Sequence, residues 1–385
     1  MTNIEWTDET WNPVRGCTPI APGCANCYAT RQAIRQAGKG GAYEGLVKST
    51  RGGPKWTGKV RVSGDKSFYA PLHWRKPRRI FVNSMSDLFH EGFSDEAIDE
   101  VFAIMAICSL HERRYGHVFQ ILTKRHARMR AYLGELNDQQ RRKSIAAKGA
   151  ALMEDGDMWL DTLTYDMQWP LENVWMGVSV SDQETANAAL DDLAHTSARL
   201  RFVSYEPALG PVDFTPWLRI AWQCSGCRAY FPDPWKKTCP KCGREDYWSG
   251  SHAYNPLAGQ RGACIDWLVV GGESGPRSRP CDVAWVRSTI EQCKAAQVPC
   301  FNKQLGAYII GDAAPFARSV HHWIERATGA HFFAPIIGEF RGKLPEEQLE
   351  RYGFRLCDAK GGDMAEWPEE LRVRQWPEER SEHER

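Results

Sequence analysis

The chain of 385 residues is long enough for one large α/β barrel with additions, or for two ordinary domains. Its 42% hydrophobic and 25% charged residues are typical of a soluble globular protein, and no apolar run approaches the roughly 20 residues that a membrane helix requires. The net charge of +1 provides no overall attraction for nucleic acid, so such binding would need a local basic patch. Because the polar, acidic start MTNIEWTDETW is unlike a secretory signal, we expect a cytoplasmic protein.

The first strong signal is a cysteine loop in the segment WNPVRGCTPIAPGCANCY, Trp11 to Tyr28, which holds Cys17, Cys24 and Cys27. A Cys-x2-Cys pair lets two thiolates converge on one metal centre, and the prolines and glycines of the loop allow Cys17 to fold back as a third ligand. A structural zinc site normally has four ligands, whereas a cubane iron–sulfur cluster held by three cysteines leaves one iron open. Three ligands therefore favour a cluster. Zinc completed by a distant His or Cys, and unligated or redox thiols, are the alternatives.

The stretch from Lys48 to Arg79 interleaves Lys and Arg with aromatic residues and contains several Gly and Pro breaks. It predicts a long loop with one short hairpin. The simpler interpretation is a solvated excursion before a strand. The alternative is a phosphate-binding face, on which Lys and Arg contact a nucleic-acid backbone while Trp56 and Trp74 stack on bases.

Short apolar segments that alternate with amphipathic helices make up most of the remaining chain. The expected strands lie within Glu5–Val14 and at Ile80–Val82, Val118–Leu122, Val174–Val180, Leu200–Val203, Ile265–Val270 and Pro299–Phe301. The expected helices begin near Ser94, near His126, at a capping box of Ser181 and Glu184, and after the cap Asp282. This alternation predicts an α/β fold with a parallel sheet covered by helices. We prefer a full or partial (β/α) barrel to an open doubly wound sheet.

Polar residues follow the predicted strands at their carboxyl ends, which meet at one mouth in a parallel barrel. For each residue alone, a hydrogen-bonded polar group at a strand end is as plausible as a ligand contact. As a set, they predict a site opposite the cysteine loop. The set comprises Asp87, Lys124, Ser179, Glu206, Glu273, Lys303 and Gln304.

A second cysteine group has the spacing of a zinc ribbon, with Cys224-x2-Cys227 and Cys239-x2-Cys242 separated by eleven residues. Two such knuckles present four thiolates, which close a tetrahedral zinc (Zn2+) site and leave no open position. We therefore expect a structural zinc ribbon in an inserted subdomain, residues 222–264. The other cysteines are expected to be ordinary buried thiols: Cys108, Cys264, Cys281, Cys293, Cys300 and Cys357.

Two further segments lie outside the strand and helix alternation. The charged, helix-prone residues 137–166 predict a surface helical insertion. Residues 311–385 form a C-terminal extension in which Ser319–Glu325 and Pro345–Tyr352 predict short helices.

Eight sequence blocks stand in an order that chance does not readily produce: WNPVRGCTPIAPGCANCYA, WTGKVR, PRRIFVNSMSDLFHE, ILTKR, VWMGVSV, RFVSYEPALGPV, IDWLVVGGESGPRSRP and FNKQLG. Together they resemble the phage-associated three-Cys-motif proteins, a family of unknown function regarded as divergent radical S-adenosylmethionine enzymes. The resemblance covers most of residues 1–310, apart from the zinc ribbon and the helical insertion. The cysteine triad of the family maps onto Cys17, Cys24 and Cys27.

The resemblance implies a barrel of the radical-SAM type, full or partial, that spans residues 1–310 and is interrupted by the two insertions. It also implies a [4Fe-4S] cluster on the cysteine triad, with S-adenosyl-L-methionine on the open iron. Two features depart from the usual pattern. Six residues separate Cys17 from Cys24 where three are typical, and the Gly-Gly-Glu that typically follows the second strand stands after the sixth, at Gly271 to Glu273.

The activity implied by the resemblance is reductive cleavage of S-adenosylmethionine, which generates a radical that modifies an unidentified substrate. The basic stretch from Lys48 to Arg79, the zinc ribbon and the phage-associated family context favour a nucleotide or a nucleic acid as that substrate, and a small metabolite or a peptide is the alternative. The family often has a separately encoded partner protein. The alternative is a nucleic-acid-binding phage or bacterial protein with structural iron–sulfur and zinc sites and no radical chemistry. Strand-end position assigns Asp87, Ser179, Glu206, Gly271, Gly272 and Glu273 to cofactor contacts, and Lys124, Lys303 and Gln304 to substrate contacts.

Overall fold

The structure is a computed structural model that describes residues 4–110, 115–153, 156–218, 221–223, 230–231, 241–243, 253–255, 260–261, 265–312, 316, 320–325, 331–333 and 352–377. The chain divides into two compact units, Met1–Ser179 with His195–Arg201, and Val180–Ala194 with Phe202–Arg385. The domain boundaries expected from the sequence stay predictions.

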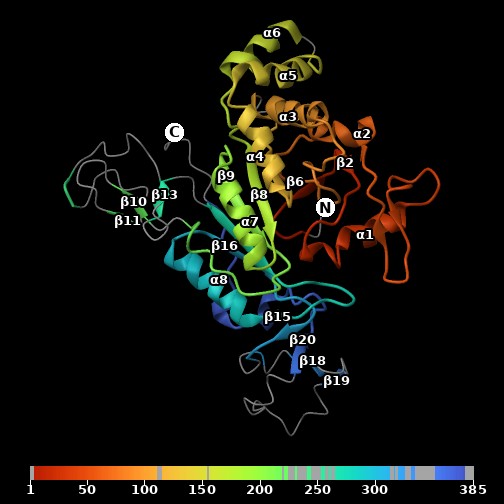
Figure 1. Ribbon diagram of the computed structural model, residues 1–385, viewed down its shortest axis with the longest axis vertical. Helices are drawn as coiled ribbons and strands as arrows, with labels where there is room; N and C mark the ends of the chain where they lie inside the picture. Colours follow the sequence, from red (N-terminus) through yellow and green to blue (C-terminus); the bar gives the residue numbers. More distant parts are fainter. Residues whose placement is uncertain are drawn as a thin grey trace. The chain divides into compact units, whose positions relative to one another are not determined.

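A parallel sheet of seven strands, in the order β1-β6-β7-β8-β9-β14-β16, gives the protein its mixed α/β character (Figure 1). The strands are β1 (Glu9–Trp11), β6 (Arg79–Val82), β7 (Val118–Thr123), β8 (Val174–Val180), β9 (Leu200–Tyr205), β14 (Trp267–Gly271) and β16 (Cys300–Gln304). The ladders β1–β6, β6–β7, β7–β8, β9–β14 and β14–β16 are all parallel. Since β1 and β16 end the order, the architecture is compatible with the partial form of the expected barrel.

The apolar segments become strands because both faces of the sheet are covered. All seven residues of β8 are buried, so both faces of this strand are covered. The strand β16 continues past the predicted end at Phe301 to Gln304. Its polar residues stay in the strand because the chain supplies hydrogen-bond partners: the Asn302 amide donates to the Val373 carbonyl at 2.7 Å.

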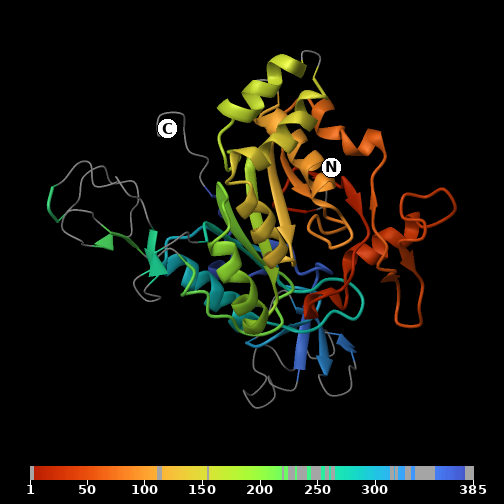
Figure 2. The same cartoon turned by 45° about the horizontal axis from the view of Figure 1, so that its top comes forward.

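The helices of the first unit are α1 (Tyr28–Ala33), α2 (Asp65–Phe68), α3 (Asp95–Leu110), α4 (His126–Glu135), α5 (Gln139–Ala150) and α6 (Gly156–Asp161). Figure 2 shows the α5–α6 segment beside α3. A Cβ on Gly149 of α5 would lie 3.9 Å from the Ala103 Cβ of α3, so the two helices are in close contact. The segment predicted as a helical insertion is therefore helical and packs on α3; its status as an insertion stays a prediction.

Residues 43–73 contain more structure than one hairpin. The strand β2 (Val14–Arg15) pairs with β5 (Arg61–Val62), and β3 (Val47–Lys48) pairs with β4 (Lys55–Trp56), both antiparallel. An apolar cluster underlies them, formed by Ala29, Ala33, Tyr43, Leu46, Val47, Trp56 and Met85. Trp56 is only 7% exposed, so the expectation that it stacks on a base is wrong.

In the second unit, α7 (Gln183–Ala194) begins one residue later than a helix capped by Ser181 would begin. The reciprocal bonds join Asp182 and Thr185, not Ser181 and Glu184: the Thr185 amide donates to Asp182 Oδ1 at 2.9 Å, and the Asp182 amide donates to Thr185 Oγ1 at 3.1 Å. Asp182 and Thr185 have the same three-residue spacing as Ser181 and Glu184. The cap of α8 (Val283–Ala295) is Asp282, as predicted.

A second sheet, in the order β15-β17-β20-β18-β19, lies in the C-terminal half of this unit. Its strands are β15 (Cys281–Asp282), β17 (Ile309–Ile310), β18 (Val320–Glu325), β19 (His331–Phe333) and β20 (Tyr352–Leu356). The predicted helix at Ser319–Glu325 is wrong over residues 320–325, which pair with β20 on one side and β19 on the other; Ser319 lies outside the described residues. Pairing with two neighbours overrides a weak local helix preference. Of the other predicted helix, residues 345–351 lie outside the described residues, and Tyr352 opens β20.

The described end of the chain packs on β16. Phe301 bridges Arg374 in antiparallel fashion, and the Trp267 indole donates to the Gln375 carbonyl at 3.0 Å. The Trp376 ring lies 5.1 Å from the Trp267 ring and 5.2 Å from the Phe301 ring. Residues 371–376 therefore cover the free edge of the last strand.

The zinc-ribbon segment is described only in part. Four short strands pair antiparallel in the order β11-β10-β12-β13: β10 (Ala221–Gln223), β11 (Tyr230–Phe231), β12 (Ala253–Asn255) and β13 (Gln260–Arg261). Cys224, Cys227, Cys239 and Cys264 lie outside the described residues, and Cys242 is exposed. Among the helices that the structure describes, none is long and apolar enough to cross a membrane.

Candidate functional site

The cysteine loop is folded back by a turn that only glycine allows. Gly16 has φ +89°, and a Cβ there would lie 2.3 Å from the Lys59 carbonyl oxygen. Gly16 also bridges Ser86, whose hydroxyl donates to the Val14 carbonyl at 2.6 Å. These contacts hold the loop against the segment that follows β6, at the carboxyl end of that strand.

The three thiols of the loop are all half-buried. Cys17 and Cys27 pack on the apolar cluster described above. Burial raises the pKa of the Cys17 thiol to about 12, and the nearby Asp87 carboxylate adds to this effect. Cys24 and Cys27 contribute in the same direction, so the three sulfurs are close enough to interact electrostatically.

Three thiols on one loop are a suitable donor set for a metal group, which binds them as thiolates and releases their protons. Within the described ranges, no group of three or more His, Cys, Asp or Glu side chains is arranged to hold a metal ion. The donor chemistry of the cysteine loop nevertheless fits a group held by three thiolates.

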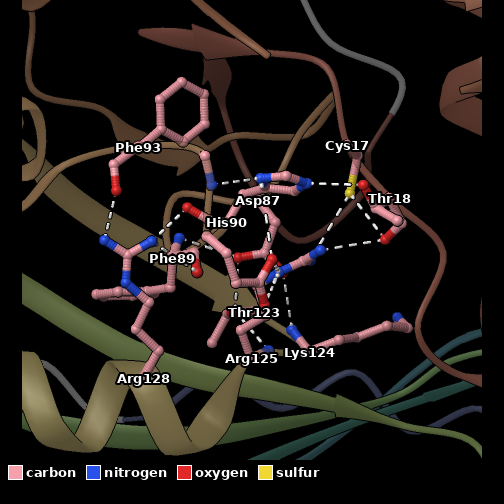
Figure 3. Close-up of polar contacts among 12 residues, drawn as sticks. Cys17, Thr18, Asp87, Phe89, His90, Phe93, Thr123, Lys124, Arg125 and Arg128 are labelled. Atoms are coloured by element: carbon pink, nitrogen blue, oxygen red, sulfur yellow. Dashed lines mark hydrogen bonds and ion pairs between the residues drawn. The ribbon is translucent and has the colours of Figure 1, made fainter. Parts of the chain in front are cut away.

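Arg125, the second residue after β7, joins the cysteine loop to the strand ends (Figure 3). Its side chain is 3% exposed. One guanidinium nitrogen, Nη1, lies 3.8 Å from Cys17 Sγ and 3.1 Å from Asp87 Oδ2, while Nη2 donates to the Thr18 carbonyl at 3.2 Å. Arg125 Nε also donates to both carboxylate oxygens of Glu91 at 2.9 Å. A buried positive charge is thus fixed beside the Cys17 sulfur.

Asp87, a predicted cofactor contact, is 5% exposed and makes its contacts within the protein. Its Oδ1 accepts from the Thr123 hydroxyl at 2.6 Å and from the Phe89 amide at 3.1 Å. Its Oδ2 accepts from Arg125 and from the Lys124 amide, the latter at 3.2 Å. Asp87 therefore fixes Arg125 and the end of β7.

His90 closes the other side of this network. The Gly92 amide donates to His90 Nδ1 at 3.0 Å, which leaves the proton of the neutral ring on Nε2. Nε2 therefore donates to Thr18 Oγ1, at 2.8 Å. Burial lowers the pKa of His90, and the charge of Arg125 lowers it further, so the ring stays neutral at pH 7. Arg128 braces the same turn through the Phe93 carbonyl (Figure 3).

Lys124 and Ser179, two predicted site residues at neighbouring strand ends, are in direct contact. Lys124 Nζ donates to Ser179 Oγ at 2.5 Å. Lys124 is half-buried, whereas Ser179 is 7% exposed. The parallel register of β7 and β8 brings them together, since Thr123 is opposite Val178.

In the second unit, Glu206 and Lys303 form an ion pair at the ends of β9 and β16. Lys303 Nζ lies 3.0 Å from Glu206 Oε1, and the two side chains are 21% and 15% exposed, respectively. The Ser204 hydroxyl donates to Glu206 Oε2 at 3.3 Å. The pair combines a partly accessible ammonium with a partly accessible carboxylate.

The predicted glycines stand where the backbone is crowded. A Cβ on Gly271 would lie 2.7 Å from Glu206 Oε1, and one on Gly272 would lie 2.2 Å from the Leu305 carbonyl oxygen. The Gln304 side-chain amide donates to the Gly272 carbonyl at 2.8 Å. Both glycines therefore have a packing role, and Gln304 fixes their backbone.

Glu273 is held by Arg279 rather than by the other predicted residues. It accepts from the Arg279 amide at 2.8 Å and from Nη2 of the same residue at 2.7 Å. The structure therefore brings together Cys17, Asp87, Lys124 and Ser179 in the first unit. In the second unit it brings together Glu206, Gly271, Gly272, Lys303 and Gln304.

The sequence analysis missed Arg125, His90 and Thr18. The available signal was their position: Arg125 follows Thr123 and Lys124 at a strand end, and His90 stands three residues after Asp87. An Arg beside a Lys normally indicates a solvated surface, which is why the pattern did not single it out.

The comparison with protein-family models gave a match over residues 1–346 to a family described as "Protein of unknown function (DUF5131)". This chain belongs to that family. The match includes the cysteine loop, both groups of strand-end residues and the zinc-ribbon segment. Comparison with curated proteins and with solved structures gave no match. Membership of DUF5131 therefore gives the family of the chain but not its activity.

Proposed function

We propose that this DUF5131 protein is an iron–sulfur enzyme of the radical-SAM type, which reductively cleaves S-adenosylmethionine to start the modification of a substrate. The observation that carries the proposal is the placement of the cysteine loop. Three half-buried thiols on one loop lie at the carboxyl end of a parallel strand, and one of them, Cys17, lies beside a buried guanidinium. Carboxyl ends of parallel strands are where α/β proteins bind their ligands.

Cys17, Cys24 and Cys27 would hold a [4Fe-4S] cluster. When bound and reduced by a one-electron donor, the cluster would supply the electron for reductive cleavage of S-adenosylmethionine, which would start hydrogen abstraction from the substrate. Arg125 would offset the negative charge of the thiolates through its contact with Cys17 Sγ. Asp87 and Glu91 fix the guanidinium for that task.

The strand-end residues would bind and orient the organic ligands. Lys124 with Ser179, and Lys303 with Glu206, each present a partly accessible cation next to an oxygen acceptor. Amino and carboxylate groups of a bound amino-acid moiety could exchange for these internal partners. Gln304 would keep the glycine backbone in place, as its bond to Gly272 indicates.

The decisive experiment measures iron and the electron spin resonance signal after anaerobic reconstitution. We expect about four irons per chain, and a reduced-cluster signal that changes when S-adenosylmethionine is added. Cys24→Ala should abolish the brown absorbance and the signal. The matched control is Cys108→Ala, a buried cysteine on α3, which should keep both. Full iron content in Cys24→Ala would rule out the assigned ligands.

The zinc ribbon is a separate part of the proposal. The strand β10 ends directly before Cys224 and pairs antiparallel with β11, so the first Cys-x2-Cys stands in the connection of a hairpin, as in a ribbon knuckle. About one zinc per chain should remain in Cys24→Ala and be lost in Cys227→Ser, since the two cysteine groups bind independently. Zinc retained in Cys227→Ser would contradict the ribbon.

The alternative function is nucleic-acid binding with structural metal sites. The exposed lysines of the β3–β4 hairpin favour it. The same spin-resonance experiment separates the two functions, because a purely structural cluster has no open iron for S-adenosylmethionine. A signal unchanged by S-adenosylmethionine would favour the binding protein.

A further inference from the structure

Two short antiparallel ladders beside the cysteine loop, β2–β5 and β3–β4, each place two cations directly opposite one another. Lys48 of β3 is the register partner of Lys55 of β4, and Arg15 of β2 is the register partner of Arg61 of β5. Like charges directly opposite in an antiparallel pair destabilise the sheet. Two such pairs in one small region call for a compensating anion.

The protein itself does not supply that anion. Between Gly45 and Ser86 the sequence has ten Lys and Arg residues and one acidic residue, Asp65. Arg78 and Arg79 pair with Glu9 and Asp8, respectively. The remaining eight have no acidic partner in the part of the chain that the structure describes. They are Lys48, Arg51, Lys55, Lys59, Arg61, Lys66, Arg75 and Lys76.

Arg15 and Arg61, which face each other across the β2–β5 ladder, contact only uncharged groups among the described residues. Arg15 donates to the Ser67 hydroxyl at 3.3 Å and lies over the Tyr43 ring. Arg61 donates to the Glu44 backbone carbonyl at 2.8 Å. These contacts orient the two guanidinium groups and leave their charges uncompensated.

The cations are also accessible. Lys48, Lys55, Lys59 and Arg61 are exposed, and Arg15 is half-buried; we call these five residues the basic hairpin surface. It adjoins the cysteine loop, because the Lys59 carbonyl approaches Gly16, the residue before Cys17. Figure 1 and Figure 2 show these loops, in red and orange, next to α1, which begins directly after Cys27.

We propose that the basic hairpin surface binds the phosphate backbone of a nucleic acid and brings the strand to the cysteine loop. The inference deepens the proposed function, on which it rests for the statement that the bound nucleic acid is the substrate. Cations spread over two separate ladders suit a polyanion with regularly spaced charges better than a single small anion. Because Trp56 is buried, affinity comes from charge rather than from that ring.

The test measures binding of the full-length protein to a labelled oligo(dT) of about 20 nucleotides, longer than the site of one single-strand-binding module. A duplex of equal length and vesicles with anionic lipid are tested in parallel. We expect oligonucleotide binding that weakens steeply with salt. In Lys48→Ala/Lys55→Ala, the slope of log K against log salt should be shallower by about 1.4 for a single strand, because two phosphate contacts are lost.

A charge reversal separates binding from folding. Lys48→Glu turns a repulsive cross-strand pair into an attractive one, so its Tm should rise while oligonucleotide affinity falls at least tenfold. The matched control is Lys143→Glu on α5, the same change at an exposed site, which should keep wild-type affinity. Affinity equal in the two variants overturns the proposal.

Two further results would also overturn it: no oligonucleotide binding at low salt, and binding to anionic vesicles without binding to the oligonucleotide or duplex. Failure of the iron–sulfur proposal gives a different pattern. Cys24→Ala should bind the oligonucleotide as the wild type does, whether or not iron is present, because binding depends on the cations of the hairpins. Loss of binding in Cys24→Ala would contradict a surface that acts through charge alone.

Discussion

Arg125 is the side chain on which the polar contacts of the cysteine loop converge. It contacts the Cys17 sulfur, the Thr18 carbonyl and two carboxylates, of Asp87 and Glu91, from a buried position. An Asp fully engaged by the protein differs from the free ligand contact that its strand-end position predicted. Sequence position could predict that Asp87 lies near the cysteine loop. It could not predict what Asp87 binds, since its partners Thr123 and Arg125 are more than 30 residues away in the sequence.

Replacing Arg125 tests this arrangement. In the reconstituted protein, Arg125→Met should lower the reduction potential of the proposed cluster by tens of millivolts, because it removes a positive charge and an N–H donor beside the sulfur of Cys17, a proposed cluster ligand. Arg125→Lys, which keeps the charge, should lie between Met and wild type. The measurement is a redox titration followed by spin resonance. Equal potentials in all three proteins would show that Arg125 acts on the fold alone.

His117 provides a pH test at the same scale. It is 1% exposed among the rings of Trp74, Tyr115 and Phe119, and burial lowers its pKa, as does the charge of Arg78. A lowered pKa in the folded state means that the unfolded chain binds the proton first. Stability is therefore retained above about pH 6.5, the pKa of a free histidine, and lost as the pH falls below it.

The variant His117→Phe should accordingly lose less stability than wild type between pH 7 and pH 5. Urea unfolding at several pH values measures the difference. His73→Gln, a change at an exposed histidine, is the control and should follow the wild-type profile. A wild-type acid response in His117→Phe would show that the buried ring does not control acid stability.

At the scale of elements, apolar runs in the sequence predicted the strands of the seven-stranded sheet well, but they did not predict the short antiparallel pairs β2–β5 and β3–β4. The strand β8 was predicted at its full bounds because burial on both faces requires a continuous apolar run. The pairs β2–β5 and β3–β4 use strands of two residues, too short to show a period of two. The strand β18 was mistaken for a helix because its pairing with β19 and β20 is not visible in the local sequence pattern.

The junction of α3, α4 and α5 makes an element-scale prediction. Asp99 of α3, 1% exposed, accepts from Tyr132 at 2.7 Å, from Arg141 at 2.9 Å and from Ser144 at 2.6 Å. Asp99→Asn leaves Arg141 without its carboxylate and should cost about 3 kcal/mol in the free energy of unfolding, the low end for a broken buried pair because Arg141 is partly accessible. Urea unfolding measures the cost.

The matched control for Asp99→Asn is an exposed ion pair that joins the same two helices, α3 and α5. Glu100 of α3 pairs with Lys148 of α5 at 3.2 Å, with side chains 46% and 26% exposed, respectively. Glu100→Gln should cost no more than about 1 kcal/mol, since solvent screens exposed pairs. Equal costs for Asp99→Asn and Glu100→Gln would show that burial of the carboxylate is not what makes the junction stable.

At the scale of the whole molecule, the seven-stranded sheet is the part that sequence reasoning anticipated, because most of its strands carry an apolar run of their own. The role of the C-terminal extension was not anticipated. Residues 371–376 complete the edge of β16 and put Trp376 against Trp267, more than 100 residues away in the chain. Contacts at such separations leave no local pattern to read.

The variant Trp376→Ala tests that role. It removes a half-buried ring that packs on Trp267 and Phe301, and it should cost about 2 kcal/mol, less than a fully buried Trp. Hydrogen exchange should accelerate in β14 and β16 and stay unchanged in α3 and α5. Glu369→Ala, at an exposed position of the same segment, should leave both regions unchanged. Uniform acceleration along the chain would contradict a local role for the ring.

Because residues 371–376 pair with β16, the edge of this strand stays open during synthesis until those residues have left the ribosome. Arg374, which bridges Phe301, leaves the ribosome about 70 residues after Gln304, the end of β16. At the 5–20 residues per second of synthesis, the nascent chain carries an open strand edge for roughly 4 to 14 seconds. Such an edge is a template for pairing with other chains, so aggregation of the nascent chain is favoured until residues 371–376 pair with β16.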